Sequence, residues 1–161
     1  MSGFSIHAVQ VAGGILALSP LPGRFGRYAE DMEHVRDWRP SIVITLNTAE
    51  ELAEAGCPDL GAAFVALGSR WVHLPVKDFG TPPEDMQKAW PETSKAALSA
   101  LRGGGRVVVH CRGGCGRSGM VLLRLMVEAG EKPLEAVDRL RAVRPCAVET
   151  AGQMNWATRK R

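Results

Sequence analysis

The segment from His110 to Gly119 (HCRGGCGRSG) places a cysteine, several glycines and an arginine at a spacing that suits chemistry on an anion. It follows the apolar run 106–110 (RVVVH) and precedes the apolar, helix-like stretch 118–129. We therefore predict a turn between a strand and a helix, at the sheet edge where α/β proteins bind ligands. Glycines at 113, 114 and 116 let successive backbone N–H groups point inward and form an anion-binding nest.

Cys111 stands at the entrance of this nest. A thiol at a helix N-terminus, beside the guanidinium of Arg117 and the imidazole of His110, is expected to have a lowered pKa and to be a thiolate at neutral pH. The planar fork of Arg117 can bind two phosphoryl oxygens at once. The hydroxyl of Ser118 can donate to the sulfur and make it a better leaving group. The segment thus predicts a nucleophile, an anion site and a charge clamp.

This segment resembles the phosphate-binding loop of cysteine-dependent protein tyrosine phosphatases, His-Cys-x5-Arg-Ser/Thr. Its glycine-rich form is most similar to compact dual-specificity phosphatases of the kinase-associated and bacterial kinds. The resemblance implies two-step hydrolysis through a cysteinyl-phosphate. The phosphate-binding residues implied are Arg112, Gly113, Gly114, Cys115, Gly116 and Arg117, with His110 tuning the thiolate. Cys115 departs from the family pattern, which usually has an aliphatic residue at that position.

The same resemblance implies a general acid on a loop roughly 30 to 40 residues before the cysteine. Asp78, in the sequence LPVKDFGTPP, lies 33 residues before Cys111 and is the predicted acid. Its alternative role is a turn or cap aspartate, and Asp85 is the alternative acid. The later stretch RPCAVETAGQ resembles a family segment whose glutamine places the attacking water, which implies that role for Gln153. A solvent-exposed glutamine at a helix start is the alternative for Gln153.

Apolar runs and helical spacing alternate around these residues. We expect strands at 14–19, 41–46, 71–74 and 106–110, and helices at 28–37, 84–101, 118–129 and 134–143, with a further helix from a capping box at 48–51 to about Gly56. This alternation predicts an α/β fold with a central, mostly parallel sheet flanked by helices. The resemblance implies that this is the protein tyrosine phosphatase-like fold, and the 161 residues suit one domain spanning 1–161.

The composition is that of an ordinary globular protein, with 45% hydrophobic and 23% charged residues. A net charge of +3 is too small for a dedicated nucleic-acid binder. We expect no membrane insertion and no signal peptide, and hence a cytoplasmic location. In that compartment the four cysteines, at 57, 111, 115 and 146, are not expected to form a disulfide framework, and their spacing does not favour zinc.

The sequence therefore favours a phosphomonoester hydrolase acting on phosphotyrosine in proteins, with phosphoserine and phosphothreonine as open extensions. Arg112 keeps a phosphoinositide or inositol phosphate open as the substrate. Alternatives from other classes are a catalytically silent phospho-ligand binding module and a sulfurtransferase. No metal or organic cofactor is expected, since the nest and Arg117 neutralise the phosphate charge. The expected partner is a phosphorylated protein, and a monomer is favoured while the oligomeric state stays open.

The cysteines support one redox hypothesis. A sulfenic acid formed on Cys111 would be trapped as a disulfide with Cys115, Cys57 or Cys146. The simpler interpretation is that Cys115 acts as a small apolar residue in an aliphatic slot.

Overall fold

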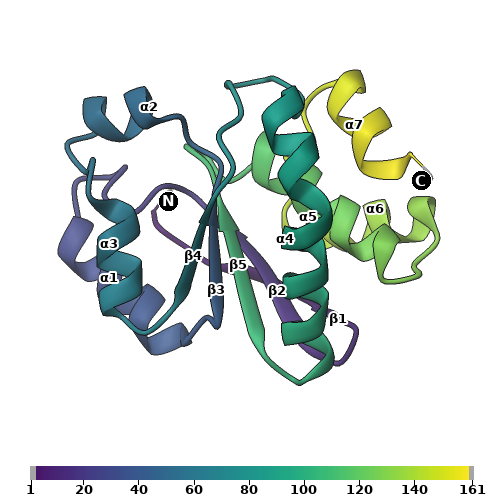
Figure 1. Cartoon of the computed structure of the whole chain (residues 1–161), viewed down its shortest axis with the longest axis horizontal. Coiled ribbons are helices and arrows are strands. Elements are labelled where there is room, and N and C mark those ends of the chain that lie inside the picture. Colours follow the sequence, from purple (N-terminus) through teal and green to yellow (C-terminus); the bar gives the residue numbers. More distant parts are fainter. Residues whose placement is uncertain (1–2, 160–161) are drawn as a thin grey trace.

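A five-stranded sheet runs through the middle of the computed structural model, which describes residues 3–159 (Figure 1). The strand order is β1-β2-β5-β3-β4. The strands are β1 (His7–Val11), β2 (Gly14–Ser19), β3 (Ile42–Thr45), β4 (Arg70–His73) and β5 (Arg106–His110). Only the β1–β2 pairing is antiparallel within the described residues, while β2–β5, β5–β3 and β3–β4 are parallel. The predicted, mostly parallel sheet is confirmed.

Helices cover both faces of this sheet. On one side lie α1 (Tyr28–Trp38), α2 (Ala49–Glu54) and α3 (Leu60–Ala66). The other side carries α4 (Glu84–Arg102), α5 (Gly116–Glu128), α6 (Pro133–Val143) and α7 (Ala151–Thr158) (Figure 1). The α/β architecture expected from the alternating pattern is therefore observed.

The alternation of side chains along β5 explains why its run of valines is continuous. Val107 and Val109 belong to the larger core cluster beneath α4 and α5, whereas Val108 belongs to the cluster that includes residues of α1 and α3. A strand buried on both faces has no solvent side and needs no polar residues. Because β5 is central, the turn that follows it emerges at the middle of the sheet's carboxyl edge.

Most predicted elements are observed within two residues of their expected bounds. Thr48 and Glu51 form the predicted capping box at the start of α2. The strand β1, the short helix α3 and the C-terminal helix α7 were absent from the predicted elements, although the alternative for Gln153 placed a helix start near that residue. The strand β1 has only five residues, and α3 has seven, which is too short for a clear helical period.

Within residues 3–159, no helix combines the length and the apolar character needed to cross a membrane.

Candidate active site

The loop between β5 and α5 has a row of backbone donors without acceptors. Among the described residues, the N–H groups of residues 112–118 donate to no protein acceptor. The first regular bond after the turn runs from the Gly119 N–H to the Cys115 carbonyl. Unpartnered N–H groups at a helix N-terminus, together with the positive end of the helix dipole, bind anions. The predicted nest therefore has its donors available.

The carbonyls of the same loop are held from the opposite side. The guanidinium of Arg144 donates from Nε to the Gly114 carbonyl and from Nη2 to the Gly113 carbonyl, both at 3.0 Å. On the other flank, the Arg112 carbonyl accepts from the Leu21 N–H at 3.1 Å. Arg144 is a residue that the sequence analysis did not assign, and it fixes which way these peptide groups face.

Gly114 is required by both conformation and space. Its φ is +70°, and a Cβ there would approach the Pro20 nitrogen and the Ser19 carbonyl carbon to 2.7 Å. A side chain at this position would clash with the chain that follows β2. The loop can therefore pack against that segment only with glycine at 114.

Cys111 and His110 lie beneath the loop, almost fully buried. The Cys111 sulfur is 3.3 Å from the Ser118 hydroxyl, as the predicted interaction requires. The His110 Nε2 is 2.7 Å from the Thr45 hydroxyl, which also accepts from Trp71. Burial lowers the pKa of His110 to about 3. His110 is therefore a neutral, fixed ring, and the charge beside the thiol comes from the arginine rather than from the imidazole.

Arg117 is held by the carboxylate of Glu51, which the sequence predicts only as part of a helix capping box. Its Nη1 and Nη2 donate to the two oxygens of Glu51 at 2.6 and 3.0 Å, and Nη1 also donates to the Val76 carbonyl. Burial opposes the charge on Arg117, but the bonds to Glu51 and the charge of Cys111 outweigh it and raise the pKa of the guanidinium. Likewise, burial alone would raise the pKa of Glu51, but Arg117 and the Thr48 backbone lower it.

One donor of Arg117 is left without a partner. The Nε is buried and makes no hydrogen bond within the described residues, while Glu51 occupies the Nη1–Nη2 edge. The Nε therefore remains for a second anion, beside Nη2, which also lies 3.5 Å from the Asp78 carboxylate. A guanidinium can satisfy two anions in this way because its donors lie in one plane on separate edges.

Asp78 lies against this cation, on a loop that is bonded to the site near both ends. Its Oδ1 is 3.5 Å from the Arg117 Nη2. Arg117 holds the Val76 carbonyl before it, and the Gln153 side chain donates to the Gly80 carbonyl after it at 3.1 Å. The alternative acid, Asp85, lies in the first turn of α4, as expected.

Gln153 is buried in α7, so the alternative of an exposed glutamine is wrong. Its Oε1 accepts from the backbone N–H groups of Glu149 and Thr150, and its Nε2 donates to Gly80. The residue is buried because it closes the capping box of α7 against the Asp78 loop. It lies beside the phosphate loop, since a Cβ on Gly116 would come within 3.0 Å of its Oε1.

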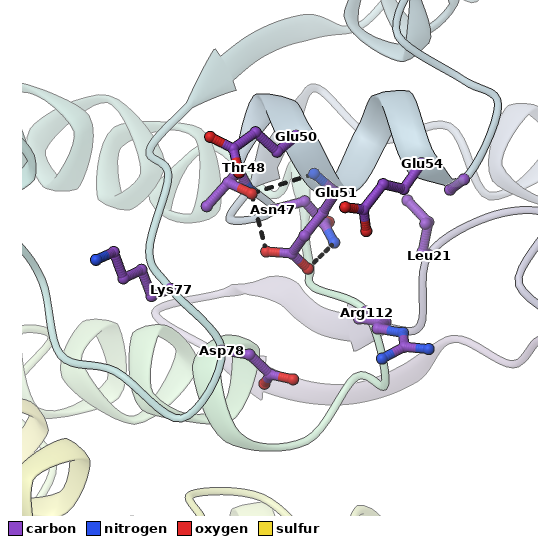
Figure 2. A pocket seen from close by; sticks show the side chains of 10 residues that line it. Leu21, Asn47, Thr48, Glu50, Glu51, Glu54, Lys77, Asp78 and Arg112 are labelled. Carbon is purple, nitrogen blue, oxygen red and sulfur yellow. Dashed lines mark hydrogen bonds between the residues drawn. The ribbon is translucent and has the colours of Figure 1, made fainter.

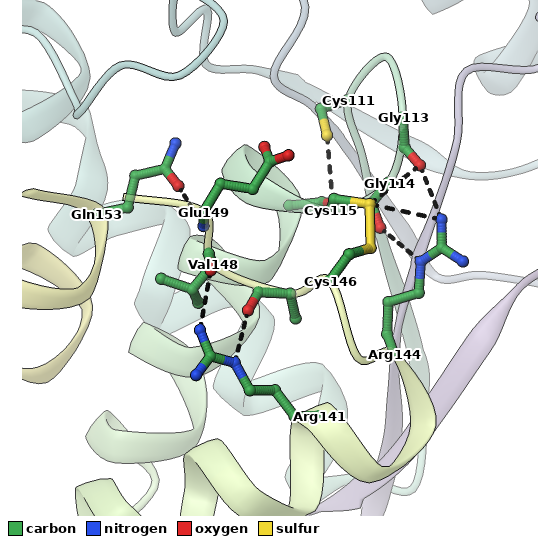
Figure 3. Close-up of a disulfide and its surroundings, with 12 residues drawn as sticks. Cys111, Gly113, Gly114, Cys115, Arg141, Arg144, Cys146, Val148, Glu149 and Gln153 are labelled. Atoms are coloured by element: carbon green, nitrogen blue, oxygen red, sulfur yellow. Dashed lines mark hydrogen bonds between the residues drawn. A yellow bond between two sulfur atoms is a disulfide. The ribbon is translucent and has the colours of Figure 1, made fainter. Parts of the chain in front are cut away.

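The cysteines correct two expectations from the sequence. Cys115 and Cys146 are joined by a disulfide, whereas no disulfide framework was expected and Cys115 was interpreted as a small apolar residue (Figure 3). Among the described residues, Cys57 and Cys111 are free. The segment after α6 returns to the phosphate loop, where Arg141 holds the Ala147 and Val148 carbonyls. That return brings Cys146 to Cys115, a contact that their spacing along the chain does not reveal.

No group of three or more His, Cys, Asp or Glu side chains within the described part of the chain is arranged to hold a metal ion.

Comparisons with known proteins agree on one family. Residues 20–131 match the family model described as "Polymorphic toxin system, DSP-PTPase phosphatase". Mouse cyclin-dependent kinase inhibitor 3 is 30% identical over 129 residues, which are 79% of this chain and 60% of that protein. A probable protein tyrosine phosphatase type IVA B from Dictyostelium discoideum is 34% identical over 77 residues, 46% of each chain. The chain thus spans 60% of the length of its cyclin-dependent kinase inhibitor 3 relatives.

Solved structures share the fold. Kinase-associated phosphatase with its catalytic cysteine replaced by serine matches with a TM-score of 0.83 and 24% identity, over 98% of this chain and 93% of that one. Tk-PTP in its active form matches with a TM-score of 0.73 and 28% identity, over 96% and 98% of the two chains.

Proposed function

This chain belongs to the DSP-PTPase phosphatase family, and we propose that it is a protein phosphatase that hydrolyses phosphomonoesters through Cys111. We propose phosphotyrosine as its substrate, with phosphoserine and phosphothreonine as the wider range. The observation that carries the proposal is the row of unpartnered N–H groups at residues 112–118, which begins directly after Cys111 and runs past Arg117. Successive backbone donors that face no protein acceptor at a helix N-terminus form a site suited to an anion.

In the first step the Cys111 sulfur attacks phosphorus and the bond to the ester oxygen breaks. The N–H groups of the loop and the Nε of Arg117 stabilise the charge on the phosphoryl oxygens. Asp78 gives its proton to the departing oxygen. Its place beside Arg117 supports this role, because that guanidinium also faces the phosphate.

In the second step water attacks phosphorus and the sulfur–phosphorus bond breaks, with the proton from water passing to Asp78. The Ser118 hydroxyl donates to the departing sulfur, which lies 3.3 Å away. Gln153 placing the water stays a prediction, because a water would have to replace one of its present backbone partners. The thiolate-tuning role of His110 likewise stays a prediction.

Hydrolysis of p-nitrophenyl phosphate tests the proposal. We expect turnover by the wild type, none by Cys111→Ser, and a loss of about 100-fold or more for Asp78→Asn. Two matched controls use the same substitutions at residues outside the site: Cys57→Ser and Asp85→Asn are expected to keep the wild-type rate. Full activity of Cys111→Ser would contradict the thiolate mechanism, and an equal loss in both aspartate variants would contradict the choice of acid. A chelator is expected to leave the rate unchanged.

The cytoplasmic location and the monomeric state expected from the sequence stay predictions. The Cys115–Cys146 disulfide bears on the first of them, because disulfides are rare in cytosolic proteins.

A further inference from the structure

A cavity of about 660 Å³ opens beside the phosphate loop, between α2 and the Asp78 loop (Figure 2). Asp78 and Arg112 line it, and both also belong to the candidate active site. Whatever occupies this cavity therefore lies next to the bound phosphate. For a protein substrate, the neighbouring group is a side chain close to the phosphorylated residue.

The wall of the cavity formed by α2 carries three carboxylates, of which only that of Glu51 forms an ion pair within the described residues. Glu51 is bound to Arg117 and Asn47, but Glu50 and Glu54 form no ion pair with any of the described residues. Both are exposed and lie four residues apart on α2, where like charges repel. Figure 2 shows the Glu54 carboxylate on the same side of the cavity as that of Glu51. A cation placed here would relieve that repulsion.

The floor of the cavity adds a second and independent requirement for a donor. Asn47 is fully buried and lines the cavity. Its Nδ2 donates to Glu51 at 3.2 Å, but its Oδ1 has no donor within residues 3–159. A buried amide oxygen without a donor is unfavourable, so it favours a ligand rich in N–H groups. Carboxylates on the wall and a carbonyl on the floor together select a guanidinium or an ammonium group.

We propose that this cavity receives an arginine or lysine side chain that flanks the phosphorylated residue of the substrate protein. The proposal rests on the proposed function, and it adds a substrate class to it. Leu21 and Ala55 in the lining provide apolar surface for the methylene stem of such a side chain. Glu54 provides the charge, since Figure 2 shows the Glu50 carboxylate turned away from those of Glu54 and Glu51.

Two cations in the lining, Lys77 and Arg112, raise the alternative of a second phosphate. Figure 2 shows the Lys77 amine extended away from Glu51 and Glu54. A second phosphate in the cavity would face the Glu54 carboxylate of α2, which opposes it. The observations therefore favour a basic peptide over a multiply phosphorylated inositol or lipid.

The test uses a set of phosphotyrosine peptides that differ at one position. Arginine, glutamine or glutamate is placed in turn at each of the three positions on either side of the phosphotyrosine. For at least one position, we expect the arginine peptide to have a kcat/KM about five-fold above that of the glutamine peptide, and the advantage to shrink with added salt. Glu54→Gln is expected to remove this advantage, and Glu54→Lys to transfer it to the glutamate peptide. Glu33 is an exposed glutamate on α1, and Glu33→Gln is the matched control, which should keep the preference for the arginine peptide.

Parallel assays on p-nitrophenyl phosphate separate this proposal from the proposed function. No turnover of that substrate by the wild type would overturn the phosphatase function itself. Turnover without any preference for arginine, or a preference that survives Glu54→Gln, would overturn only the basic subsite. An equal loss on both kinds of substrate in Glu54→Gln would also overturn it, because Glu54 would then act on the catalytic centre. A kcat/KM on an inositol bisphosphate above that on every peptide would assign the cavity to a second phosphate.

Discussion

The two sides of the phosphate loop differ in how completely their polar groups are satisfied. On the outer side, Arg144 binds the carbonyls of Gly113 and Gly114, and the disulfide ties Cys115 to the segment after α6. On the inner side, the N–H groups of residues 112–118 and the Nε of Arg117 have no partner among the described residues. The carbonyl groups of this loop are thus hydrogen-bonded on its outer side, while its N–H groups are left without partners from residues 3–159 on its inner side.

This difference shows how a glycine-rich loop can stay ordered while its donors remain free. A flexible loop would turn its N–H groups toward its own carbonyls or toward solvent. Here the carbonyls are already held by a guanidinium, and Gly119 packs so closely that a Cβ would come within 2.6 Å of the Val148 nitrogen. The outer contacts preorganise the anion site, so less reorganisation is needed when the phosphate binds.

The inner side should be the more sensitive one, and Arg117→Lys tests this most strongly. Lysine keeps the charge but loses the planar fork that serves Glu51 and the phosphate together. We expect kcat/KM on p-nitrophenyl phosphate to fall about 1000-fold, or about 4 kcal/mol of transition-state stabilisation. Arg139→Lys, which removes a guanidinium bonded far from the loop to Glu131, is the control and should keep its activity. A small loss in Arg117→Lys would mean that charge alone suffices.

The outer disulfide should contribute to stability rather than to rate. It closes a separation of 31 residues, so Cys146→Ser is expected to lower the free energy of unfolding by roughly 3–4 kcal/mol. Denaturant unfolding with and without reductant measures this, with Cys57→Ser as the matched control. Reductant should shift the wild type to the variant's midpoint and leave the variant unchanged. A loss of activity in Cys146→Ser larger than the loss of stability explains would show that the disulfide shapes the inner side as well.

His110, beneath the loop, should make stability depend on pH. Its pKa of about 3 in the folded protein lies below the ordinary value of 6.5, so the unfolded chain takes up a proton first as the pH falls. The contribution of neutral His110 to the free energy of unfolding is therefore fully present above pH 6.5 and decreases as the pH falls toward 3. Between pH 7 and pH 5 we expect the wild type to lose about 2 kcal/mol more than His110→Asn does. Glu51, whose pKa is lowered from 4.5, titrates below this window. Equal pH slopes would contradict a buried neutral imidazole.

The sequence reveals the inner side much better than the outer one. Cys111, Arg117 and the glycines lie within one short segment, so a local pattern defines them. Asp78 is predicted through the resemblance to the phosphatase family, which implies a general acid on a loop before the cysteine. The sheet follows from β-branched runs such as that of β5, because a strand buried on both faces leaves a continuous apolar signal.

The residues that support the loop carry no such signal. Glu51 meets Arg117 across 66 residues and Arg144 meets Gly114 across 30. Glu51 was correctly interpreted as part of a capping box, but one carboxylate accepts from both the Thr48 backbone and Arg117. The capping box accounts for the contact of Glu51 with the Thr48 backbone, so the sequence gives no sign of its second contact, with Arg117. Arg144 and Cys146 reach the loop only because α6 returns the chain to it, which is a tertiary effect.

Arg144→Lys tests whether the hydrogen bonds to the loop carbonyls on the outer side affect anion binding on the inner side. A lysine cannot hold both the Gly113 and Gly114 carbonyls with the same planar geometry, so the loop should lose part of its preorganisation. We expect kcat/KM to fall about tenfold, or about 1.4 kcal/mol, with inorganic phosphate becoming a weaker competitive inhibitor to a similar degree. Arg141→Lys is the matched control, because Arg141 bonds to the carbonyls of Ala147 and Val148 and not to the loop. A similar loss in both variants would point to the whole segment after α6 rather than to the carbonyl contacts of Arg144. A loss confined to Arg144→Lys would show that bonds made outside the loop set the anion affinity inside it.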